Sequence, residues 1–250
     1  MSNTPTVVLV HGAFADASSY APVIRRLLDE GVKVVAPPSA NRSLSSDAAY
    51  IASVVRQIEG PVLLVGHSYG GAVITVAGNE DNVVGLVYLA AYVLDNGESL
   101  GELQGRFAPA ALAEALVYTP YPIDGSSEPG IDVSVDITRF PGIFAADVSP
   151  ELTSVLAVSQ RPLAAAAFGE PASAPAWANK PAWGVVASAD QAINPEMQRF
   201  GYERAGASVV EIDSSHLVMH AHPADVVAVI HEALEAVTGL QSAPVASAAL

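Results

Sequence analysis

The sequence predicts an α/β fold with a mostly parallel, doubly wound sheet. Short apolar runs rich in β-branched residues, the pattern of strands buried on both faces, alternate with segments of helical spacing. The connections between them are short, which favours consecutive elements that pack side by side. With 250 residues, 51% of them hydrophobic, the chain is long enough to bury one large core.

Six runs have the length and composition of strands. They are Thr6–Val10, Lys33–Ala36, Pro61–Val65, Val83–Leu89, Ala182–Ala187 and Ser208–Ile212. Five further segments have the apolar spacing of helices. They are Pro22–Leu28, Asp47–Ile58, Gly71–Gly78, Asn194–Arg204 and Pro223–Val237. Strands and helices in alternation predict a parallel sheet that is covered on both faces.

The stretch from residue 95 to residue 180 breaks this alternation. It is rich in Pro, Gly, Ala and Ser, and it contains breakers such as the Tyr-Thr-Pro-Tyr-Pro run at 118–122. Within it, Ala108–Leu116 and Pro150–Ser159 are predicted as helices. Because long structureless loops are uncommon in compact domains, we expect a small lid inserted between two strands of the sheet.

This division leaves one core and no second domain. Residues 1–94 and 181–240 are expected to form the core, with residues 95–180 as the lid. The last segment, residues 241–250, consists mostly of small side chains that are polar or alanine, which predicts a flexible tail.

Composition excludes several classes of function. The formal net charge of −15 would repel a nucleic-acid backbone, so we expect no nucleic-acid partner. The chain has no cysteine, hence no disulfide, thiolate nucleophile or Cys-based metal site. The sequence shows no basic region ahead of an apolar signal core and no apolar run of membrane-spanning length. A cytoplasmic protein with no membrane partner is therefore expected, and its oligomeric state cannot be predicted.

The segment around Ser68 carries the strongest chemical signal. An apolar strand, Val62-Leu63-Leu64-Val65, runs into Gly66-His67-Ser68-Tyr69-Gly70, which fits G-x-S-x-G, and then directly into a helix. A serine on so sharp a strand-to-helix turn is held in a strained conformation that lifts its hydroxyl clear of the sheet. Small residues two positions away on either side make that turn sterically feasible. Ser68 is therefore the predicted nucleophile.

A second loop is expected to approach this serine. The first strand ends in His11-Gly12-Ala13-Phe14, where a backbone passing close to the nucleophile can direct N–H groups at an oxyanion. The predicted donors are the backbone N–H groups of Ala13 and Tyr69. Phe14 is the alternative to Ala13 and is favoured as a pocket residue, and His11 is favoured as a packing residue that holds the loop.

A serine hydroxyl needs a base, and the base needs an orienting acid. Of the six histidines, His216 follows the last strand, where an open sheet places residues over the carboxyl ends of its strands. His220 and His222 lie closer to the last helix and are favoured as structural, and their spacing does not form an H-E-x-x-H metal site. No metal site is therefore expected.

The predicted acid is Asp190, in the loop after the Ala182–Ala187 strand, because chain order requires it between the nucleophile and the base. A helix cap is the other use that this position allows for an aspartate. Asp95, which follows the preceding strand, is the rival acid.

At these residues the chain resembles the small α/β-hydrolases of the plant methyl-salicylate esterase and hydroxynitrile lyase group and their bacterial relatives. The matching motifs are VLVHGAF near the start, VLLVGHSYGG at the turn, the D-x-x-I-x-P loop around Asp190 and SSHLVMHAHP near the end. The resemblance implies a triad of Ser68, Asp190 and His216, an oxyanion hole from Ala13 and Tyr69, and no cofactor. It also implies hydrolysis rather than lysis, since this chain has Leu217 and Gly12 where the lyases carry lysine and threonine.

The predicted function is cleavage of an ester bond of a small, apolar molecule through an acyl-enzyme. Phe14, Phe140 and Phe144 are the candidate pocket residues. Two alternatives stay open. The same acyl-enzyme could be intercepted by peroxide, which would make the protein a cofactor-free perhydrolase or haloperoxidase, or the scaffold could bind a small molecule without turnover.

Overall fold

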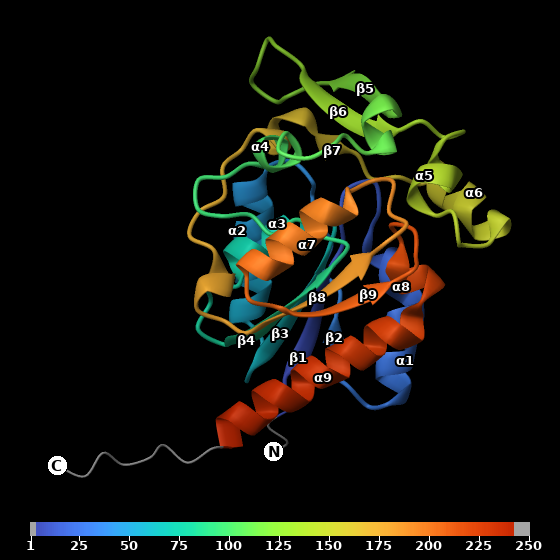
Figure 1. Ribbon diagram of the computed structural model, residues 1–250. Helices are drawn as coiled ribbons and strands as arrows, with labels where there is room; N and C mark the ends of the chain where they lie inside the picture. Colours follow the sequence, from blue (N-terminus) through green and yellow to red (C-terminus); the bar gives the residue numbers. More distant parts are fainter. Residues whose placement is uncertain (1–3, 243–250) are drawn as a thin grey trace.

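The computed structural model describes residues 4–242, with side chains through residue 239. Its centre is a six-stranded sheet in the order β2-β1-β3-β4-β8-β9, and all adjacent strands are parallel (Figure 1). The strands are β1 (Thr6–Val10), β2 (Val34–Val35), β3 (Val62–His67), β4 (Val83–Leu89), β8 (Ala182–Ala187) and β9 (Ser208–Ile212). The predicted fold class is confirmed, and each predicted strand is present, although β2 is two residues shorter than the apolar run that predicted it.

The strand order determines where a site can form. From β1 the chain moves outward to β2, returns to the other side of β1 as β3, and then continues through β4, β8 and β9. The direction of winding therefore reverses between β1 and β3. In open parallel sheets, ligands bind outside the carboxyl ends of the strands at such a reversal. The loops after β1 and β3 are the ones that carry Ala13 and Ser68.

Helices cover both faces of the sheet, with α1 and α9 on one and α2 and α3 on the other (Figure 1). The helices of the core are α1 (Ala21–Asp29), α2 (Leu44–Arg56), α3 (Tyr69–Ala77), α7 (Pro195–Arg204), α8 (Val218–Ala221) and α9 (Pro223–Ser242). Helix α2 starts three residues earlier than predicted. The side chain of Ser43 accepts a hydrogen bond from the N–H of Ser46 and so caps the helix there.

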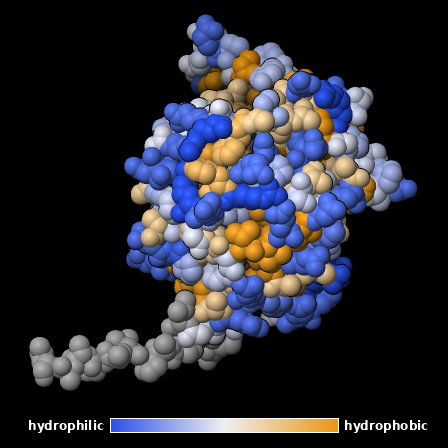
Figure 2. Space-filling model, in the orientation of Figure 1, coloured by the Kyte–Doolittle hydropathy of each residue, from blue (hydrophilic) through white to orange (hydrophobic). Residues whose placement is uncertain are grey.

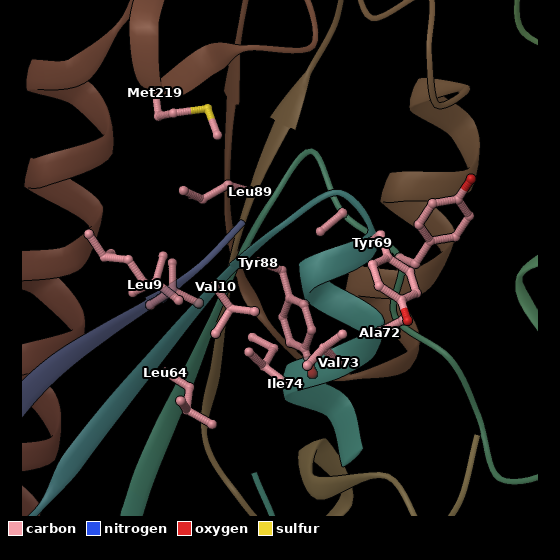
Figure 3. Packing of buried hydrophobic residues seen from close by; sticks show 14 of the residues in the cluster. Leu9, Val10, Leu64, Tyr69, Ala72, Val73, Ile74, Tyr88, Leu89 and Met219 are labelled. Carbon is pink, nitrogen blue, oxygen red and sulfur yellow. The ribbon is translucent and has the colours of Figure 1, made fainter. Parts of the chain in front are cut away.

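The core fills the space between these layers. Side chains of a strand alternate between faces, so Val10 of β1 and Tyr88 of β4 point toward α3, whereas the neighbouring Leu9 and Leu89 point to the opposite face (Figure 3). All four are fully buried. The carboxyl ends of β1 and β3 are thus anchored from both sides, which gives the loops that follow them a rigid base.

The segment between β4 and β8 contains a second, antiparallel sheet of three strands, β5 (Leu116–Tyr121), β6 (Gly130–Val135) and β7 (Leu163–Ala164). It also contains helices α4 (Leu100–Gln104), α5 (Phe140–Phe144) and α6 (Pro150–Val158). In Figure 1, β5, β6, α5 and α6 lie above the carboxyl ends of the central strands. We call residues 95–180 the cap.

The predicted helix Ala108–Leu116 is wrong. Only a 3₁₀ turn forms, at Ala111–Glu114, and the chain then enters β5. The run at 118–122, interpreted as breakers, contributes Tyr118, Thr119, Pro120 and Tyr121 to that strand. Tyrosine and threonine favour strands, and proline is tolerated because β5 is an edge strand that pairs only with β6. Helix α6, in contrast, matches its prediction to within one residue.

Helix α9 continues through Ser242, two residues into the predicted tail. The rest of that predicted tail, residues 243–250, lies outside the described residues. Among residues 4–242, no helix has both the length and the apolar character needed to cross a membrane.

Candidate active site

Ser68 occupies a one-residue turn between β3, which ends at His67, and α3, which begins at Tyr69. Its backbone has φ 54° and ψ −123°, a conformation that costs a residue with a side chain on the order of 1–3 kcal/mol. The turn is also too crowded for larger neighbours. A Cβ on Gly66 would lie 2.5 Å from the carbonyl oxygen of Gly70, and a Cβ on Gly70 would lie 2.3 Å from that of Val10. The two glycines of the motif are therefore required by backbone contact.

The loop after β1 passes directly over Ser68, because a Cβ on Gly12 would lie 2.7 Å from the Cβ of Ser68. His11 holds this loop in place. Its Nδ1–H donates to the carbonyl of Gly12 over 2.9 Å, and its Nε2 accepts the N–H of Ser39 over 2.8 Å. Burial lowers the pKa of His11, in keeping with a neutral ring that both donates and accepts. His11 thus acts in packing, as the sequence favoured.

Ala13 and Tyr69 line a small cavity together with Ser68. Among the described residues, neither N–H donates a hydrogen bond to another part of the protein. Phe14, the alternative donor, differs, because its N–H already donates to the carbonyl of Arg161 over 2.9 Å. The two predicted donors, Ala13 and Tyr69, therefore keep N–H groups without a partner among the described residues, whereas Phe14 does not.

The structure brings Asp190 and His216 together. Asp190 Oδ2 lies 2.7 Å from His216 Nδ1, and both side chains are 0% exposed. Asp190 Oδ1 accepts the backbone N–H groups of Ala192 and Ile193 over 2.7 and 3.0 Å. The carboxylate is thereby fixed, and it fixes in turn the ring orientation and the tautomer of His216. Asp95 has no such contact and forms part of an exposed turn.

Gln198 of α7 is a further member of this group that the sequence did not reveal. Its Nε2–H donates to Asp190 Oδ2 over 2.8 Å, and its Oε1 accepts the N–H of Ala187 over 3.0 Å. The side chain is fully buried. No motif signals this glutamine, since it reaches the carboxylate only because α7 packs against β8.

His67 joins the turn to the loop of His216. Its Nε2–H donates to the backbone carbonyl of His216 over 2.9 Å, and the two rings lie 4.5 Å apart. Ser68 and His216 are themselves not hydrogen bonded, and Nε2 of His216 is buried without a partner among the described residues. Bonds between nucleophile and base are often long in the absence of substrate. The free Nε2 is the atom that would take a proton.

The cap also holds the loop that carries His216. Asp147, which follows α5, accepts the hydroxyl of Ser214 over 2.8 Å and the N–H of Ser215 over 2.9 Å through Oδ2, and its Oδ1 accepts the hydroxyl of Ser215. The carbonyl of Phe144 accepts the N–H of Leu217 over 3.1 Å. The chain on both sides of His216 is therefore tied to the segment 144–147.

Two of the three predicted pocket residues border the cavity at Ser68. Phe14 and Phe144 line it, and the Phe144 ring meets the His216 ring edge-on at 4.5 Å. Phe140 does not line it. It stacks behind Phe144, with ring centres 4.9 Å apart, and faces a separate small cavity. Phe168 also lines the cavity, and the lining residues that the sequence did not single out are Tyr92, Leu100, Leu112, Leu163, Ala192 and Ile193.

The buried histidines predict how stability depends on pH. Burial holds the pKa of His67 well below its usual 6.5, so the folded chain leaves this ring neutral where the unfolded chain begins to protonate it. As the pH falls below about 6.5, the unfolded state binds more protons, and the free energy of unfolding drops by up to about 1.4 kcal/mol per pH unit for this residue.

Replacing His67 with glutamine removes that titration and keeps an N–H that can reach the carbonyl of His216. Urea unfolding between pH 7.5 and 5.5 is expected to give a shallower fall in stability for His67→Gln than for the wild type. Equal slopes would contradict a neutral, buried His67.

Comparisons with known proteins agree with this geometry. Residues 7–229 match the alpha/beta hydrolase family. The chain is 31% identical over 124 residues to a carbendazim hydrolyzing esterase of Nocardioides sp. (strain SG-4G), a match that covers 44% of this chain and 51% of that esterase, about half its length. It is 27% identical over 239 residues to the probable hydrolase R7 of Phoma sp. (strain ATCC 20986 / MF5453), covering 85% of this chain and 91% of that protein.

Among solved structures, polyneuridine aldehyde esterase superposes with a TM-score of 0.77 at 19% identity, covering 95% of this chain and 99% of the other. This likeness concerns the fold. The family match spans both the Ser68 turn and the His216 loop, and it confirms the resemblance that their motifs indicated. The chain belongs to the alpha/beta hydrolase family.

Proposed function

We propose that this protein is a serine esterase that hydrolyses a small-molecule ester through a triad of Ser68, His216 and Asp190. The observation that carries the proposal is the buried pair of His216 and Asp190, whose Nδ1 and Oδ2 atoms lie 2.7 Å apart. Nε2 of His216 has no partner among the described residues, and a hydrogen bond from His67 ties the loop of His216 to the Ser68 turn. Two similar proteins are named as an esterase and a probable hydrolase, which supports this reaction class.

In the first step, Nε2 of His216 takes the proton of the Ser68 hydroxyl as Oγ bonds to the ester carbonyl carbon. The carbonyl oxygen becomes an oxyanion, which accepts the N–H groups of Ala13 and Tyr69. Asp190 stabilises the imidazolium, because its carboxylate already accepts Nδ1–H. The tetrahedral intermediate then collapses, and the departing alcohol takes the proton from Nε2.

In the second step, water attacks the acyl-enzyme, and His216 again accepts the proton. A second tetrahedral intermediate forms in the same oxyanion hole. Its collapse breaks the bond to Ser68 Oγ, which recovers its proton from His216, and the carboxylic acid leaves. Every proton is returned, so the protein ends each cycle unchanged.

Covalent labelling tests this assignment. A fluorophosphonate is expected to modify the protein at Ser68, as located by peptide mass spectrometry, because it reacts with activated serine hydroxyls. Labelling should be lost in His216→Ala, which removes the base. His220→Ala is the matched control, since His220 lies four residues after His216, on α8, and no hydrogen bond joins it to Asp190 among the described residues.

Retained labelling in His220→Ala with loss in His216→Ala would support the triad. Modification of another serine, or equal labelling in both variants, would refute it. Turnover of an activated aryl ester by the wild type then distinguishes an esterase from a protein that only binds.

A further inference from the structure

A larger cavity adjoins the one that Ser68 lines. It has a volume of about 330 Å³ and lies between the α4–β5 segment of the cap and helix α7. Its wall includes Phe107, Leu112, Ala113 and Leu116 of the cap and Ile193 and Met197 at α7. We call it the side chamber. In Figure 2, hydrophobic surface gathers between the positions that α4 and α7 occupy in Figure 1.

The side chamber and the cavity at Ser68 share a wall made of four residues. Leu112, Phe168, Ala192 and Ile193 border both. The cavity at Ser68 has a volume of only about 20 Å³, and so does the cavity on its far side, behind Phe14 and Phe144. Of the two cavities that share walls with the one at Ser68, the side chamber is therefore the one with room for a large group on an ester held at Ser68.

The chemistry of the wall restricts what can enter. No Asp, Glu, Lys or Arg is among the residues that line the side chamber. Two side-chain amides line the chamber, and both already donate hydrogen bonds. Gln104 donates to the hydroxyl of Tyr92 over 2.5 Å, and Asn194 donates to the carbonyl of Ala108 over 3.0 Å. A charged group placed there would lose its hydration without gaining a partner. The chamber suits a neutral, apolar group.

Resting on the esterase function proposed above, we propose that the side chamber binds the larger arm of the substrate. The substrate class is an ester that joins a compact arm to a long, neutral, apolar arm such as an alkyl chain or linked aromatic rings. The carbonyl lies at Ser68, and the long arm passes Ile193 and Leu112 into the chamber. Its volume falls within the range of about 300–1,000 Å³ that is usual for small-molecule sites.

Ala113 offers a way to fill the chamber without disturbing the core. It lies on the 3₁₀ turn Ala111–Glu114, lines the chamber and is otherwise exposed, so Ala113→Trp places an indole in the cavity at little cost to packing. Ala166→Trp is the matched control. It introduces the same side chain at an exposed position of another 3₁₀ turn, Ala165–Phe168, outside the chamber wall.

The experiment measures kcat/KM for two series of esters. One series lengthens the acyl arm from acetate to decanoate with a constant p-nitrophenol leaving group, and the other lengthens the alcohol arm of acetate esters. In the series whose growing arm enters the chamber, kcat/KM of the wild type should rise by up to about fourfold for each methylene removed from water. Ala113→Trp should lower kcat/KM for the longest of these esters by about tenfold or more. For the shortest ester of the same series, kcat/KM should stay within about twofold of the wild-type value.

A length preference in either series that Ala113→Trp abolishes and Ala166→Trp preserves would support the proposal and identify the arm. The absence of a length preference in both series would overturn it, as would equal effects of the two tryptophans. Failure of the esterase proposal itself has a different signature, because no ester of either series would then be hydrolysed.

Discussion

Replacing Ser68 with alanine is expected to lower kcat for an activated aryl ester by a factor on the order of 10⁵ or more. The loss should be this large because the variant lacks the hydroxyl proposed to form the acyl-enzyme, so that binding and the oxyanion N–H groups alone would continue to act. The fold should be retained, since alanine is no larger than serine and the crowded backbone contacts at Gly66 and Gly70 are unaffected. Burst and steady-state kinetics, with thermal unfolding as the check on folding, measure both effects.

Ser39→Ala is the matched control for this variant. Ser39 is also buried, and its hydroxyl has no hydrogen-bond partner among the described residues, so the rate should stay near that of the wild type. A Ser68→Ala protein that is folded and keeps more than about a hundredth of the wild-type rate would show that the nucleophile lies elsewhere.

Replacing Asp190 with asparagine is expected to lower kcat by about 10³- to 10⁴-fold. The amide preserves the shape of the side chain, but its NH2 group must replace either Oδ2, which accepts Nδ1–H of His216 and the amide of Gln198, or Oδ1, which accepts the N–H groups of Ala192 and Ile193. At Oδ1 the NH2 group would face two backbone donors, whereas at Oδ2 His216 can change tautomer and leaves only Gln198 as an opposed donor. The second arrangement is therefore favoured, and in it Nε2 of His216 is protonated and cannot take the proton of Ser68.

Asp95→Asn separates this effect from a general loss of negative charge. It makes the same chemical change at the rival acid, which is exposed and does not contact His216, so the rate should remain within about twofold of the wild type. If Asp95→Asn were the more damaging substitution, the assignment of the acid would have to be reversed.

The central sheet could be predicted because parallel strands buried on both faces have a strong local pattern. The runs Val7–Val10 and Val62–Val65 are apolar at every position, and all of these residues are fully buried. The turn at Ser68 was equally predictable from its motif, although only Gly66 is required by a contact nearby in the chain, with Gly70, whereas Gly70 is required by the backbone of Val10. Ser68, Asp190 and His216 stay predictions as catalytic residues, although the structure places Asp190 against His216 as chain order suggested.

The cap was less predictable because its contacts are not local. Strand β5 depends on β6, which pairs Tyr118 with Val133, and nothing in the isolated segment distinguishes such a pairing from a loop. Gln198 and Asp147 lie outside every motif and reach the site only through the packing of α7 and the cap. Phe140 was expected in the pocket because it is aromatic, but the helix that carries it directs Phe144, not Phe140, toward Ser68.

The link between Asp147 and the loop of His216 limits how caps can be exchanged among relatives. A chimaera that replaced residues 95–180 to acquire another substrate preference would also lose the hydrogen-bond acceptors for Ser214, Ser215 and Leu217. The imidazole would then sit on a loop with unsatisfied donors, and the graft would lose rate for reasons unrelated to its new pocket. The boundaries of such a cap exchange are better chosen so that Phe144 and Asp147 of the original protein are kept, because these two residues belong functionally to the core.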